Sequence, residues 1–155
     1  MLDLPGYVAS LAQRIATTGA DIAAPRIEYG DGARSAQLYM DGDLPGSSIP
    51  PTSTIHLVER WSRSYVDQPW RLDEYAYDLI DHERDVRIAF HLHDADWFVN
   101  TYRVVVHEHC ERPIGVSTCR HYAGTPIARG FEALDRLMSA WMSEAVEDCA
   151  LRTCL

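Results

Sequence analysis

Several common functional signatures are missing from the sequence, and each absence removes a class of protein. There is no Walker loop and no G-x-G-x-x-G, H-E-x-x-H or G-x-S-x-G pattern, which excludes the nucleotide-binding, zincin and α/β-hydrolase motifs. No cysteines have C-x-x-C spacing, and the start of the chain has neither a basic segment nor a long apolar run. No segment has the length and hydropathy of a membrane span. We therefore expect a cytoplasmic protein without membrane contact, in which the cysteines are free thiols.

Basic residues are also scarce. The chain has 14 Lys and Arg against 23 Asp and Glu, which gives a net charge of -9. Such a molecule repels nucleic acid at long range, so any phosphate chemistry needs a local basic patch. The length of 155 residues, with 46% apolar and 24% charged residues and no internal repeat, predicts a single globular domain over residues 1–155.

The apolar spacing predicts a helix near each end of the chain. Apolar residues recur at helical spacing over residues 4–15, with Asp3 as the N-cap and Gly19 as the C-terminal stop. The spacing becomes helical again from Thr125 onward, which predicts a long C-terminal helix. Its apolar stripe consists of Ile127, Phe131, Leu134, Met138, Trp141 and Ala145.

Between these helices the sequence is typical of strands. A hairpin is expected around Gly30-Asp31-Gly32, and residues 41–51 have the composition of a surface loop. Four further strand-like runs are rich in β-branched and aromatic residues and are joined by short polar segments. They cover residues 52–61, 72–80, 86–93 and about 101–109. The predicted fold is therefore α+β: an antiparallel meander sheet of about five to six strands, with an N-terminal helix and a long C-terminal helix packed on its apolar face.

Two of these runs carry charged residues and histidines at alternate positions. In residues 86–93 the even positions are apolar, whereas the odd ones include arginine and histidine, and the run at 101–109 follows the same rule. Side chains alternate across a strand, so the odd positions of both runs share one face. The predicted polar face consists of Arg87, His91, His93, Arg103, His107 and His109.

The relative positions of these histidines depend on the strand register. A turn centred at Phe98 would set His91 opposite Val105 and His107 opposite Ala89. The two imidazoles would then be diagonal neighbours, roughly 7 to 8 Å apart at their Cβ atoms. Their ring nitrogens could flank one small group.

Two imidazoles with arginines can cleave RNA without metal or other cofactor. One histidine takes the proton of a ribose 2′-OH, another protonates the leaving 5′-oxygen, and arginine stabilises the charge that develops on phosphorus. We expect His91 to act with His107 or His109 as base and acid, and Arg87 and Arg103 to contact phosphate.

Three other interpretations stay open. His91, His93, His107 and His109 have the spacing of ligands for Zn²⁺ or another divalent transition metal, either in a metal-binding protein or in a metal-dependent enzyme. The polar face could equally be an ordinary solvated face. In a non-enzymatic interaction module, this face or the segment 41–51 would dock a partner.

The order of short motifs resembles the TumE family of bacterial and archaeal toxins. The motifs are Leu57-Val-Glu59, Tyr75-Ala-Tyr77, Arg87 leading to His91-x-His-Asp94, and His107-Glu-His109, after an N-terminal helix. Members of that family are small proteins encoded beside a helix-turn-helix antitoxin and regarded as RNA-targeting ribonucleases. The resemblance spans roughly residues 4–111 and implies an RNA substrate and an antitoxin from an adjacent gene, and it leaves a homodimer open. The expected substrate-binding residues are Glu59, Tyr75, Tyr77 and His93.

Overall fold

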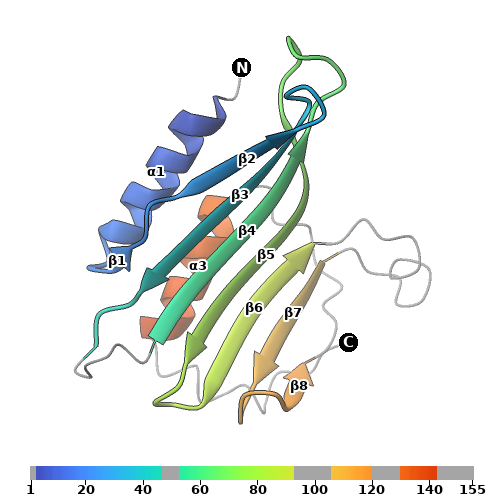
Figure 1. Ribbon diagram of the computed structural model, residues 1–155. Helices are drawn as coiled ribbons and strands as arrows, with labels where there is room; N and C mark the ends of the chain where they lie inside the picture. The colour runs from blue at the N-terminus through green and yellow to red at the C-terminus, as the bar shows by residue number, and fades with distance from the viewer. Residues whose placement is uncertain (1–2, 47–52, 93–105, 120–129, 143–155) are drawn as a thin grey trace.

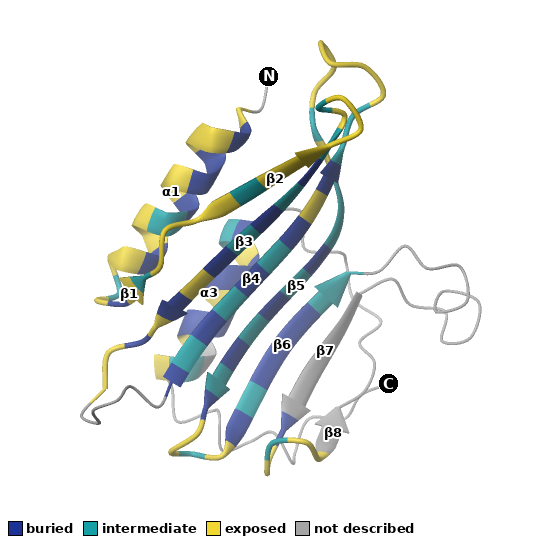
Figure 2. Cartoon of the chain, in the orientation of Figure 1, coloured by how far each residue is buried: buried dark blue, intermediate teal, exposed yellow. Residues whose placement is uncertain are grey.

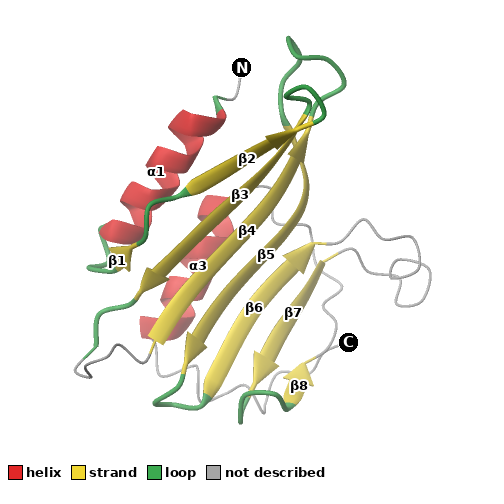
Figure 3. Ribbon diagram, viewed as in Figure 1, coloured by secondary structure: helices red, strands yellow, loops and turns green. Residues whose placement is uncertain are grey.

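The computed structural model describes residues 3–46, 53–92, 106–119 and 130–142, and these ranges form one antiparallel sheet with two helices (Figure 1). The strand order is β1-β3-β4-β5-β6-β7-β8, and β2 also pairs with β3. Every pairing is antiparallel, and the helices are separate from the strands of the sheet (Figure 3), which confirms the α+β class. The elements are α1 (Leu4–Ala16), β1 (Asp21–Ile22), β2 (Arg26–Gly30), β3 (Ser35–Asp43), β4 (Ser53–Ser62), β5 (Arg71–Asp81), β6 (Val86–Leu92), β7 (Val106–Glu111), β8 (Ser117–Cys119) and α3 (Gly130–Met142).

Helix α1 begins as the sequence predicts. The Asp3 carboxylate accepts a hydrogen bond from the backbone N–H of Gly6, so Asp3 is the N-cap. The helix ends at Ala16, and Gly19 follows with a φ of 86°. The buried face of α1 has helical periodicity and consists of Leu4, Tyr7, Val8, Leu11 and Ile15.

The hairpin of β2 and β3 turns where the sequence has Gly30-Asp31-Gly32. Asp31, Gly32 and Ala33 all have positive φ, which places consecutive residues of the turn in the left-handed region. The backbone N–H of Arg34 closes the turn by donating to the carbonyl of Gly30. This tight connection fixes the register of β2 on β3.

Both helices lie on one side of the sheet, which we call the helix side (Figure 1). Along β4 and β5, buried residues alternate with less buried ones, as the banding in Figure 2 shows. The buried set faces α1 and α3 and forms the core. We call the opposite side of the sheet the far side. Neither helix of the described ranges is long and apolar enough to cross a membrane.

Six strands of ordinary length carry the described sheet, as expected, and the two further strands, β1 and β8, are only two and three residues long. Two details differ from the expectation. The C-terminal helix is short rather than long, since α3 has 13 residues, the same as α1. Strand β3 continues to Asp43, into the segment expected to be a loop, because Asp41, Gly42 and Asp43 pair with β4.

Candidate functional site

The far side carries the residues that the alternation of polar and apolar positions selected. On β6, Val86, Ile88 and Phe90 are buried in the core, whereas Arg87 and His91 lie on the far side and are partly exposed. Cross-strand partners share a side of the sheet, and His91 pairs with Ala76 of β5. The parity prediction for this strand is thus confirmed.

An arginine held by two carboxylates lies on the far side, close to the start of β6. Arg87 Nε donates to Asp78 Oδ1 over 2.8 Å, and its Nη1 donates to Glu111 Oε1 over 2.7 Å. The second oxygen of Glu111 accepts from the backbone N–H of Gly115 at 2.9 Å. Because these groups come from β5, β6 and β7, the network ties three adjacent strands together.

Partial burial strengthens this network. The side chains of Asp78 and Arg87 are 17% and 24% exposed, so water screens their charges less than at an open surface. Burial by itself would raise the pKa of Asp78, but the hydrogen bonds and charges of His91 and Arg87 outweigh it and lower that pKa. Burial would lower the pKa of Arg87, but Asp78 and Glu111 outweigh it and raise that pKa. The carboxylate and the guanidinium therefore stay charged near neutral pH.

His91 lies beside the same carboxylate. Its Nε2 is 3.4 Å from Asp78 Oδ2, a long contact that orients the ring. In a neutral imidazole whose Nε2–H donates a hydrogen bond to Asp78, the acceptor lone pair is on Nδ1. In such a tautomer the acceptor nitrogen is the one turned away from Asp78.

The strand register brings a second histidine next to His91. In the pairing of β6 with β7, His91 is the direct partner of His107, and Ala89 is the partner of His109. The expected register, with His91 opposite Val105 and His107 opposite Ala89, is wrong by two residues. The physical reason is that a register can slip by two residues without turning any side chain to the other face, so the alternation of polar and apolar positions could not distinguish the two pairings.

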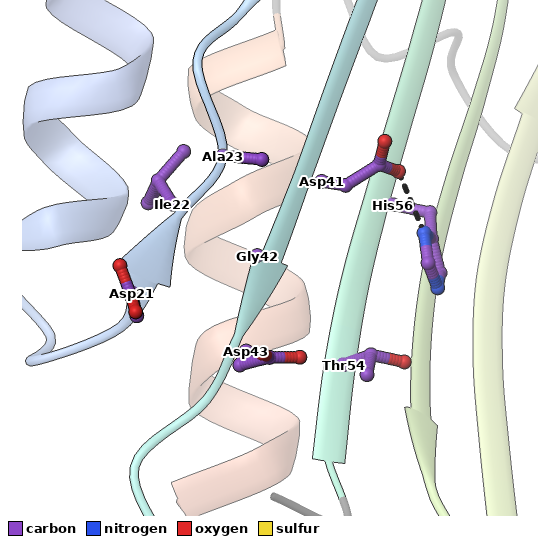
Figure 4. A pocket seen from close by; sticks show the side chains of 8 residues that line it. All are labelled: Asp21, Ile22, Ala23, Asp41, Gly42, Asp43, Thr54 and His56. Atoms are coloured by element: carbon purple, nitrogen blue, oxygen red, sulfur yellow. Dashed lines mark hydrogen bonds and ion pairs between the residues drawn. The ribbon is translucent and has the colours of Figure 1, made fainter.

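The far side also holds a histidine that the sequence analysis did not select. His56 of β4 is the cross-strand partner of Asp78, and its Nδ1 lies 2.7 Å from Asp41 Oδ1 (Figure 4). This pair borders a hollow of about 250 Å³ at the ends of β1, β3 and β4. The alternation in β4 could have identified His56, because Thr54, His56, Val58 and Arg60 occupy the less buried positions between the core residues.

The carboxylate of Asp78 lies beside His91. No signal in the sequence told Asp78 apart from an ordinary surface charge, because its role depends on two partners from β6.

Cross-strand pairing arranges the far-side positions of β3 to β7 in two neighbouring rows. One row is Asp41, His56, Asp78, Ala89 and His109, and the next is Tyr39, Val58, Ala76, His91 and His107.

Three expected substrate-binding residues lie on the helix side instead. Glu59, Tyr75 and Tyr77 are buried, with 0%, 2% and 0% of their surface exposed. Tyr75 and Tyr77 pair with Leu92 and Phe90, which belong to the core face of β6. The sheet therefore separates these three residues from His91, and they do not join one site with it.

On the helix side, Glu59 is the acceptor at the centre of a buried cluster. Its Oε1 accepts hydrogen bonds from the hydroxyls of Tyr7 and Tyr77, each at 2.6 Å, and its Oε2 accepts from Trp61 Nε1 at 2.8 Å. Burial raises the pKa of Glu59, and the three hydrogen bonds only partly oppose this effect. Burial and the nearby Glu59 raise the pKa of Tyr77 well above 10. The first residue of α3, Gly130, packs directly against this cluster.

The remaining candidates fall in parts of the chain where less is described. His93 and Arg103 lie outside the described residues, and for His107 and His109 only the backbone placement is described. The proposed metal ligands therefore include one residue, His91, whose side chain is placed. Among the described side chains, no three histidines, cysteines or carboxylates are grouped so that they could hold a metal ion.

Comparisons with known proteins add no relative to this description. No protein-family model, no curated protein and no solved structure matches the chain.

Proposed function

We propose that the chain is a metal-independent, ribonuclease-like toxin that cleaves RNA on the far side of its sheet by histidine acid–base chemistry. One observation carries the proposal. His91 and His107 are direct cross-strand partners, and Asp78 lies beside His91. Two imidazoles on adjacent strands, one of them oriented by a carboxylate, suit a reaction that needs a base and an acid on either side of one phosphate.

In the proposed reaction the Nδ1 atom of His91 takes the proton of a ribose 2′-OH. The 2′-oxygen attacks phosphorus, and the 5′-oxygen leaves with a proton from His107. The products are a 2′,3′-cyclic phosphate and a free 5′-OH, and the two histidines have exchanged protonation states. A third group, Asp78, stabilises His91 when it becomes the imidazolium.

Arg87 acts in this scheme chiefly through Asp78. Its guanidinium is engaged by two carboxylates, which offset its charge, so it holds Asp78 in place more than it clamps phosphate. The net charge of -9 also predicts that the molecule repels RNA at long range, so binding depends on local basic groups. Arg103, and His109 as an alternative to His107, complete the proposed set.

A helix-turn-helix antitoxin encoded by an adjacent gene is the protein partner of this proposal. It would neutralise the toxin, and in this scheme it does so by covering the far side. The two proteins should co-purify when they are produced together.

The direct test is cleavage of a mixed RNA by the purified protein in EDTA. The test variant is His91→Ala with His107→Ala, and the matched control is His82→Ala, since His82 is exposed in the turn between β5 and β6. Cleavage should fall by about a hundredfold or more in the double variant, because acid–base catalysis contributes at least that much, and should be unchanged in the control. Equal cleavage by the double variant and the native protein would refute the assignment.

A metal-dependent function is the second candidate, favoured by the direct pairing of His91 with His107 and by the Asp78 carboxylate beside His91. His93 and His109 would supply further ligands for Zn²⁺ or a related ion. The same assay with added Zn²⁺ or Mn²⁺ separates the two candidates. Cleavage only with metal would replace the first proposal by the second, and no cleavage under either condition would refute both.

A further inference from the structure

Strand β2 forms an edge of the sheet. It pairs with β3 on one side, and in the described ranges no strand pairs with its other side (Figure 1). Four of its five residues are exposed, and Figure 2 shows most of the strand in the exposed colour. Edge strands present backbone N–H and C=O groups that can pair with another chain.

The side chains of β2 are divided between the two sides of the sheet. Arg26 pairs with Tyr39 and so lies on the far side, and Glu28 follows two residues later on the same side. The Arg26 guanidinium lies 4.5 Å from the centre of the Tyr39 ring and 3.2 Å from the Glu28 carboxylate. Both charged groups are more than half exposed, so they are available at the edge.

The order of these charges is self-complementary. If two copies of β2 pair antiparallel about a two-fold axis, facing residues must lie on the same side of the sheet, so the axis passes through a residue. An axis at Arg26 would bring two arginines together, and an axis at Glu28 would bring two glutamates together. Only an axis at Ile27 sets each Arg26 opposite the Glu28 of the other copy, which is the favourable cross-strand combination.

We infer that β2 is a dimerisation edge that pairs antiparallel with β2 of a second copy of this chain, with Ile27 on the two-fold axis. Two Arg26–Glu28 pairs then form on the far side. On the helix side, the exposed ring of Tyr29 faces Pro25 of the other copy. A two-fold contact of this kind is closed, so it yields a dimer and does not extend into a fibre.

The dimer would join the two far sides into one continuous surface. Each copy carries a net charge of -9, which opposes association and makes it depend on concentration. The interface is also short, because β2 has five residues and Pro25 precedes it. A reversible dimer of moderate affinity is therefore expected.

The experiment measures the dimerisation constant of the full chain by sedimentation equilibrium. Three variants change only exposed charges of β2: Arg26→Glu, Glu28→Arg, and both together. Each single change places like charges at both 26–28 pairs of the dimer and should weaken dimerisation about tenfold or more. The double change again places charges of unlike sign at both pairs and should restore the dimer. Arg34→Glu is the matched control, because Arg34 is exposed in the turn after β2 and the net charge changes equally.

Each outcome decides the inference. A native protein that is monomeric at every concentration overturns it, and so does a dimer that the single charge changes leave intact. A dimer weakened as much by Arg34→Glu as by Arg26→Glu responds to net charge alone and also overturns it. Circular dichroism confirms that the variants fold, and hydrogen exchange of the β2 amides should slow as the concentration rises if the edge is paired.

Discussion

Two carboxylates on opposite sides of the same sheet have opposite properties. Glu59 on the helix side is surrounded by the neutral donors of Tyr7, Tyr77 and Trp61, and burial raises its pKa. Asp78 on the far side has His91 and Arg87 as partners, and they lower its pKa although burial alone would raise it. The residue type is nearly the same, so the difference comes from the partners.

This comparison separates a structural cluster from a candidate site. Hydrogen bonds from neutral groups satisfy Glu59 but do not fully offset the cost of burying its charge. For Asp78, the hydrogen bonds and charges of His91 and Arg87 do offset that cost, and the side chain of His91 is 14% exposed. The Glu59 cluster is closed and joins α1 and α3 to the sheet, whereas the side chains of the Asp78 network are partly exposed on the far side.

The largest expected effect comes from removing the acceptor on the helix side. Glu59→Ala leaves three buried donors without their partner and creates a cavity, so the free energy of unfolding should fall by about 3 kcal/mol or more. Urea denaturation measures this change. The control is Glu132→Ala, an exposed residue of α3 bonded to Arg136, which should cost no more than about 0.5 kcal/mol. Equal losses in the two variants would show that the cluster has no special structural role.

A smaller effect is expected where α3 meets the same cluster. A Cβ atom at Gly130 would lie 2.5 Å from the Tyr7 hydroxyl and 2.6 Å from Glu59 Oε1, closer than van der Waals contact allows. Gly130→Ala should therefore destabilise the protein by about 1 to 3 kcal/mol, although alanine normally favours a helix over glycine. Ser139→Ala, at an exposed position of α3, is the control and should change stability by less than about 0.5 kcal/mol. A stabilised Gly130→Ala variant would contradict the tight packing.

The smallest effect is a pH dependence of opposite sign for the two carboxylates. The folded pKa of Glu59 is above its usual 4.5, so the native protein should lose stability relative to Glu59→Gln as the pH rises above 4.5. The folded pKa of Asp78 is below its usual 3.8, so its contribution is present above pH 3.8 and is lost relative to Asp78→Asn as the pH falls. Each change is limited to about 1.4 kcal/mol per pH unit.

Thermal or urea unfolding of the native protein and both variants over this pH range gives the two differences. If the stability difference between the native protein and its variant changed with pH in the same direction for Glu59→Gln and Asp78→Asn, the partners would not set the two pKa values as described. The variants serve as controls for each other, since each removes one titrating group and keeps the volume of the side chain.

The sequence predicted the fold better than it predicted the site. The N-cap at Asp3, the hairpin at Gly30-Asp31-Gly32 and the antiparallel sheet follow from local rules, because capping, turn conformation and strand alternation involve neighbouring residues. The apolar stripe with helical spacing from residue 125 onward predicted the C-terminal helix but not where that helix ends. Apolar spacing alone does not mark where a helix ends.

For the candidate site, alternation correctly put Arg87 and His91 on one side of the sheet. It could not give the register that pairs His91 with His107, because pairings that differ by two residues keep the same sides. It also did not separate Glu59, Tyr75 and Tyr77 from the histidines, since a motif order says nothing about which side of a sheet each motif faces.

The sequence by itself thus determined the fold class, most of the elements and, for β6, which residues share a side of the sheet. Only the tertiary structure decided that Asp78 joins Arg87 and His91, that Glu111 completes this network from β7, and that Glu59 is enclosed beneath α3. The reason is physical. Alternation and capping depend on residues a few positions apart, whereas these contacts join segments whose relative position is set by strand register and helix packing.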